Sequence, residues 1–114
     1  MRRSLRAVAR AMPRLPAVGR TLIERRLRDV SHRLKAVTVD LAVAEEQLSH
    51  FADDADEAHL RALVSETPGA EQVHREAQRH AEAMRRHRDA LVAEVRQLEA
   101  SQDDLLDRLV AAQT

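Results

Sequence analysis

A repeat of apolar residues, spaced alternately four and three positions apart, constrains this chain more than any other feature. A spacing that averages 3.5 residues keeps side chains on one face of a helix and is typical of a left-handed coiled coil. After Phe51 the same face becomes rich in Ala. We therefore expect an all-α chain whose first long helix, starting near Thr21, carries an apolar seam. One position of the repeat is held by Leu27, Leu34, Leu41 and Leu48, and the other by Ile23, Val30, Val37, Ala44 and Phe51.

The composition favours helix and excludes several other classes. Among 114 residues there are one Phe, no Trp, no Tyr, no Cys and two Gly. A sheet needs β-branched and aromatic residues with frequent turns, and these are scarce. A disulfide scaffold, a zinc ribbon and thiol chemistry all need Cys. No apolar run approaches the length of a membrane-spanning helix.

A short break separates the first helix from a second one. Thr67 is suited to cap the second helix, and Pro68 is suited to its first position. The stretches on either side, residues 21–66 and 68–112, are nearly equal, so we predict an antiparallel helical hairpin with its turn at residues 67–69. The predicted seam of the second helix has one stutter and consists of Val73, Ala77, His80, Met84, Arg88, Leu91, Val95, Leu98, Gln102, Leu105 and Leu109.

A turn centred on Pro68 places residues opposite each other when their numbers sum to about 136. This register brings Glu57 to Arg79 and Asp40 to Arg96, which are pairs of opposite charge. One seam between two helices makes a thin core. We therefore predict self-association into a homodimer, as a four-helix bundle or longer coiled coil, or else a stable protein partner.

Charge is divided unevenly along the chain. Residues 1–35 carry eleven basic and two acidic residues, whereas residues 36–114 carry eight basic and seventeen acidic residues. Residues 1–20 form a basic segment in which apolar residues have helical spacing and a linker follows at Pro13, Pro16 and Gly19. The arginines of this segment are the candidate site for an anionic surface, namely Arg2, Arg3, Arg6, Arg10 and Arg14.

The basic segment has three interpretations. It can dock on anionic phospholipid headgroups, or on the phosphate backbone of nucleic acid, as on a ribosome. It can also be a tail without a separate partner, or fold against the acidic residues 40–57 of the same or another protomer. The lack of aromatic residues weakens the first two, because no Trp anchors a membrane interface and no ring stacks on bases.

No residue pattern is typical of an active site. Residues 56–59 spell DEAH, a helicase box, but the chain lacks the Gly-rich, Lys-containing loop that binds phosphate in such enzymes. No Ser lies in a Gly-rich elbow. We therefore expect no enzyme, no cofactor and no small-molecule substrate.

The six His residues leave two further hypotheses beside that of ordinary polar positions on a helix. They could bind metal or respond to pH. His50 and His87 are expected to face each other, and no full ligand set for a metal can be assembled, so no metal site is predicted. Two carboxylate–histidine pairs have the i, i+3 spacing used in di-metal bundles: Glu71 with His74, and Asp56 with His59.

Two runs of sequence, DEAHLRALVSETP over residues 56–68 and HREAQRHAEAM over residues 74–84, resemble a family of small, uncharacterised actinobacterial coiled-coil proteins. The resemblance covers most of residues 20–110. It implies a coiled coil in a bacterial cytoplasm, and it carries no site residues.

These observations predict a non-enzymatic coiled-coil interaction or adaptor protein in the cytoplasm, with a peripheral membrane location as a variant. The alternative function is a binding module for an anionic surface, either membrane headgroups or nucleic acid, through the Arg-rich segment. The seam expected to hold the protein together is Leu27, Val30, Leu34, Val37, Leu41, Leu48, Phe51, Leu91, Val95, Leu98, Leu105 and Leu109.

Overall fold

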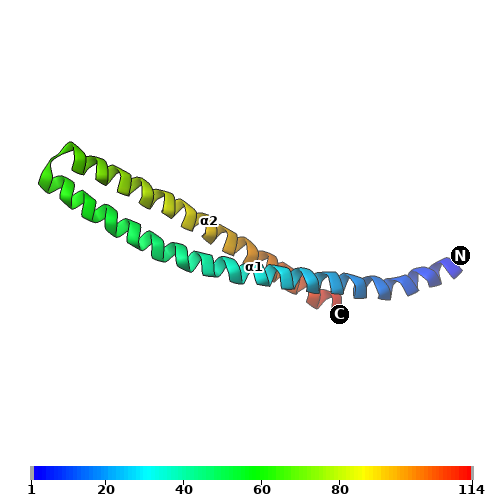
Figure 1. Ribbon diagram of the computed structural model, residues 1–114. Helices are drawn as coiled ribbons and strands as arrows, with labels where there is room; N and C mark the ends of the chain where they lie inside the picture. Colours follow the sequence, from blue (N-terminus) through cyan, green and yellow to red (C-terminus); the bar gives the residue numbers. More distant parts are fainter. Residues whose placement is uncertain (1, 114) are drawn as a thin grey trace. The chain divides into compact units, whose positions relative to one another are not determined.

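The protein is all-α and consists of two helices joined by a short turn (Figure 1). The computed structural model describes the backbone of residues 2–113 and the side chains of residues 19–113. Helix α1 spans Arg2–Ser65 and helix α2 spans Pro68–Gln113. The two helices pack against each other in opposite directions, which confirms the predicted antiparallel hairpin.

The chain divides into two compact units, each built from one stretch of both helices. The turn unit is Ala36–Val95 and contains the turn. The terminal unit combines residues 1–35 with residues 96–114. Within each unit the seam residues of the two helices are buried or half-buried against each other.

The seam of α1 follows the predicted repeat without interruption. Its spacing of four and three continues past Phe51 through three small residues, Ala55, Ala58 and Ala62. Val37 is the largest side chain that is fully buried, at 0% exposure. Each of the twelve residues predicted to hold the seam is buried or half-buried.

The seam of α2 corrects the prediction between residues 70 and 81. Val73 is 55% exposed and His80 is also exposed, whereas Ala81 is buried and His74 is half-buried. The seam therefore runs through positions 70, 74, 77, 81 and 84 in strict alternation, and the predicted stutter is wrong. Val73 is the more hydrophobic residue, but its side chain points away from α1. The seam instead contains the residues whose side chains point toward α1, and some of these are Ala.

The register also differs from the predicted one. The side chains that meet across the hairpin are Phe51 with His80, His59 with His74, and Ser31 with Gln102, so opposed residue numbers sum to 131 to 133. The predicted sum was about 136, because the turn was assumed to centre on Pro68. Pro68 already belongs to α2.

Glu57 shows the consequence of this shift. It was expected to pair with Arg79 on the other helix, but its carboxylate accepts a hydrogen bond from Arg61 of its own helix at 2.6 Å.

Polar residues in the α2 seam explain why this register is preferred. His74, Arg88 and Gln102 occupy seam positions at intervals of fourteen residues. The ring of His74 lies 4.7 Å from that of His59, and Gln102 Nε2 donates to Ser31 Oγ at 3.0 Å. A polar seam residue that finds a partner in only one alignment specifies register, because other alignments leave it unpaired.

The turn consists of Glu66 and Thr67. Glu66 adopts a left-handed conformation, with φ of 49°, and its N–H donates to the carbonyl of Ala62, which closes the end of α1. Thr67 Oγ1 accepts a hydrogen bond from the N–H of Ala70 at 3.2 Å. Pro68 is the first residue of α2. The predicted N-cap is thus confirmed, while the turn is shorter than the predicted residues 67–69.

The Thr67 cap gives a first testable expectation. Thr67→Ala removes the acceptor for the Ala70 N–H and should lower the free energy of unfolding by about 1 kcal/mol. Urea denaturation followed by circular dichroism measures the change. Thr67→Ser keeps the hydroxyl and should stay close to the wild type. Equal losses in both variants would contradict the capping role.

At its beginning, α1 is helical through Pro13, Pro16 and Gly19, where the sequence favoured a linker. Proline has a φ near −65°, which is a helical value, but inside a helix it removes a backbone hydrogen bond and its ring crowds the carbonyl of residue i−4. The side chains of residues 1–18 lie outside the described residues. The separate role of the basic segment 1–20 stays a prediction.

Candidate interaction surface

The core of the hairpin is thin and is made largely of small residues. Among the described residues, seven apolar residues are buried, and four of them are Ala. Large apolar side chains remain exposed elsewhere on the same helices. The distribution of these exposed side chains around the two helices identifies the candidate surface.

One side of the turn unit collects most of its exposed large apolar residues. We call it the apolar–acidic face. It combines two stripes that follow helical spacing and carry acids and His but no Lys or Arg. The stripe on α1 consists of Val39, Val43, Glu46, His50, Asp53, Glu57, Leu60 and Val64, and the stripe on α2 consists of Val73, Glu76, His80, Ala83, His87, Ala90 and Glu94.

Contacts within the turn unit place both stripes on the same side of the hairpin. The ring of His80 packs edge-on against Phe51, with 6.0 Å between ring centroids. A shallow groove further along is lined by Val43 and Gln47 of α1 and by His87 and Leu91 of α2. Both contacts join α1 to the α2 stripe that carries His80 and His87. Val43 and the α2 stripe therefore lie on the same side of the hairpin, and the α1 stripe continues this surface onto the outer side of α1.

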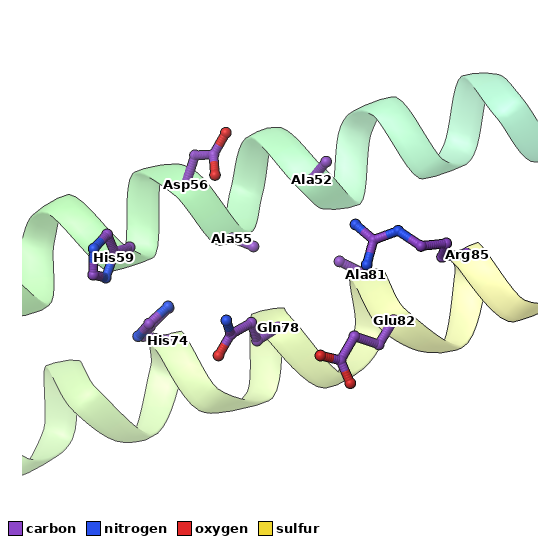
Figure 2. Close-up of a pocket in the computed structure, with 9 residues that line it drawn as sticks. All are labelled: Ala52, Ala55, Asp56, His59, His74, Gln78, Ala81, Glu82 and Arg85. Carbon is purple, nitrogen blue, oxygen red and sulfur yellow. The ribbon is translucent and has the colours of Figure 1, made fainter.

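The opposite side of the turn unit has a different chemistry, and we call it the mixed-charge face. A groove there is lined by Asp56 and His59 of α1 and by Gln78, Glu82 and Arg85 of α2, above Ala55 and Ala81 in the seam (Figure 2). Helical spacing adds Glu45 and Leu63 to this face. Arginine and carboxylate alternate here, in contrast to the apolar–acidic face.

His59 and His74 are the two histidines that meet across the hairpin (Figure 2). The sequence instead favoured His50 with His87, because it used a register shifted by about one helical turn. Over the residues that the structure describes, no group of three His, Cys, Asp or Glu side chains could hold a metal ion. The carboxylate–histidine spacings therefore do not combine into a metal centre in this part of the chain.

The structure separates the two predicted sets of site residues. The seam residues lie between the helices, as described above. The five arginines of the anionic-surface prediction, Arg2, Arg3, Arg6, Arg10 and Arg14, lie outside the residues whose side chains are described. The apolar–acidic face was missed by the sequence analysis. Its signal is the spacing of four between Val39 and Val43 and between Leu60 and Val64, which the stronger seam repeat obscures.

Neither helix, over its described residues, has a stretch that is both long and apolar enough to cross a lipid bilayer.

Comparison with known proteins found no family model, no curated protein and no solved structure that matches the chain. The resemblance of residues 56–68 and 74–84 to actinobacterial coiled-coil proteins therefore stays a prediction.

Proposed function

We propose that this protein is a non-enzymatic coiled-coil interaction protein that works as a homodimer in the cytoplasm. One observation carries the proposal: large apolar side chains are exposed in two groups on the apolar–acidic face. Exposed apolar groups of this kind mark an interaction surface, because their contact with water costs free energy that a partner relieves. The first group is Val39 and Val43, and the second, near the turn, is Leu60, Val64 and Val73.

The thin core supports the same conclusion. Among residues 19–113, the large apolar residues that are buried are Val37, Leu91 and Leu105. Small folds without disulfides or metals depend on association when their own core is insufficient. A second hairpin laid on the apolar–acidic face would bury the exposed Val and Leu residues and complete a bundle.

An adaptor also needs a surface that stays free after dimerisation. The mixed-charge face meets this requirement, because it lies on the other side of the turn unit and carries Arg and carboxylate side chains. A third protein would contact that face through charged and polar pairs, which favour specificity over affinity.

Two exposed leucines provide a test of the dimer. Leu60 is 62% exposed on the apolar–acidic face of the turn unit, and Leu106 is 43% exposed on α2 in the terminal unit, outside that face. Leu60→Ser should raise the dimer dissociation constant about tenfold or more, since each copy loses roughly 1.5 kcal/mol of apolar burial. Leu106→Ser should leave it within about twofold. Sedimentation equilibrium measures both constants.

A wild-type chain that stays monomeric at the highest concentration studied would contradict the homodimer. Equal weakening by the two serine variants would contradict the choice of face.

A further inference from the structure

We propose that the basic segment, residues 2–19, of one copy docks on the apolar–acidic face of the turn unit of a second copy, and that the exchange is reciprocal. This inference rests on the proposed homodimer and names the element that forms its interface. The juxtaposition joins the most basic part of the chain to a face whose stripes carry acids and His but no Lys or Arg.

Charge complementarity is the first argument. Residues 2–19 contain five Arg and no Asp or Glu, whereas the α1 stripe of the apolar–acidic face carries Glu46, Asp53 and Glu57 and no Lys or Arg. Among the acids on the apolar–acidic face, Glu46 and Asp53 are exposed and lie seven residues apart on one stripe. Two isolated apolar–acidic faces would repel each other, and a basic segment between them removes that repulsion.

The second argument is that the apolar residues of the segment follow a phase different from that of the hairpin seam. The seam spacing, extended back from Ile23, falls on the charged Arg20 and on Pro16 and Pro13, which lack the backbone N–H. A second stripe with the same alternation of three and four ends at the exposed Leu22. In the sequence it consists of Leu5, Val8, Met12, Leu15, Gly19 and Leu22. A basic stretch with its own apolar stripe matches a face that combines acids with exposed Val and Leu.

We place the acceptor on a second copy because the basic segment then forms the interface of the proposed homodimer. Two copies that exchange their segments form a closed, symmetric dimer in which each contact occurs twice.

Charge reversal of the face and of the segment, in separate full-length variants, tests the proposal. The face variant is Glu46→Lys with Asp53→Lys, and the segment variant is Arg6→Glu with Arg10→Glu. Each variant alone should raise the dimer dissociation constant by about tenfold or more at physiological salt, because like charges then meet at both contacts. An equimolar mixture should restore wild-type affinity, since each contact again joins opposite charges.

A control pair of equal charge change is available on the mixed-charge face. Glu45→Lys with Glu82→Lys should leave the dissociation constant within about twofold of the wild type. Circular dichroism of every variant checks that the hairpin remains helical.

Three outcomes would overturn the proposal. A wild-type chain that is monomeric removes the proposed function together with this inference. A dimer that survives both reversed variants leaves the proposed function intact and excludes the segment as its interface. A segment variant that still dimerises, but no longer binds vesicles of anionic phospholipid or a single-stranded RNA that the wild type binds, assigns the segment to an external anion.

Discussion

Val37→Asp should unfold the hairpin. Val37 lies in the seam of α1 with no exposed surface, and no larger described side chain is fully buried. A carboxylate at this position would be buried without a positive partner, which costs several kcal/mol. Since small domains are stable by only about 5–15 kcal/mol, a two-helix hairpin cannot absorb this loss. The helical signal at 222 nm should fall by more than half under conditions in which the wild type is folded.

A graded series makes the prediction for Val37 quantitative. Val37→Ala removes two methyl groups and should lower the free energy of unfolding by about 2 kcal/mol. Ala42→Asp introduces the same carboxylate at an exposed position of the same helix, away from the apolar–acidic face, and should lower it by no more than about 1 kcal/mol, mainly through the lower helix propensity of Asp. If Val37→Asp kept wild-type helicity, Val37 would not be a core residue, and the seam described above would be wrong.

The seam of α1 is predicted well from the sequence, because large apolar residues and charged residues are clearly separated there. From Ile23 to Phe51 every seam position of α1 holds an apolar residue, so one helical phase stands out. The cap was also predictable, because Thr67 followed by Pro68 satisfies two terminal preferences at once.

Prediction failed where small and polar residues form the seam. Between positions 70 and 81 the α2 seam holds Ala and His, and Val73 next to it is more hydrophobic than any of them. A prediction based on hydrophobicity therefore assigned the wrong set of α2 residues to the seam. The same error hid the contact between His59 and His74, because it requires a register set by the short turn at Glu66 and Thr67. The candidate surface was missed for a related reason, since its residues become visible only after the seam positions are assigned.

The small residues near the turn lead to the second large effect, which is expected at Ala81. This residue is 5% exposed and lies in the α2 seam, where it lines the groove with Ala55 of α1 (Figure 2). Helices can approach closely where their facing residues are small, and the interaxial distance depends on the side chains at the contact. Ala81→Leu adds three heavy atoms at this contact. It should force the helices apart locally or drive the Leu side chain from its preferred rotamer, and should lower the free energy of unfolding by about 1–3 kcal/mol.

Ala93→Leu is the matched control for Ala81→Leu, because it makes the same change at an exposed position of α2. Leucine has nearly the helix propensity of alanine, so the control should shift the free energy of unfolding by no more than about 0.5 kcal/mol. Thermal and urea unfolding of the two variants give the comparison. Two effects of Ala81→Leu on the free energy of unfolding oppose each other. Burial of the extra carbon atoms raises it, and steric crowding in the seam lowers it. If Ala81→Leu raised the melting temperature, the gain in burial would dominate, and the Ala residues near the turn would not set the distance between the helices.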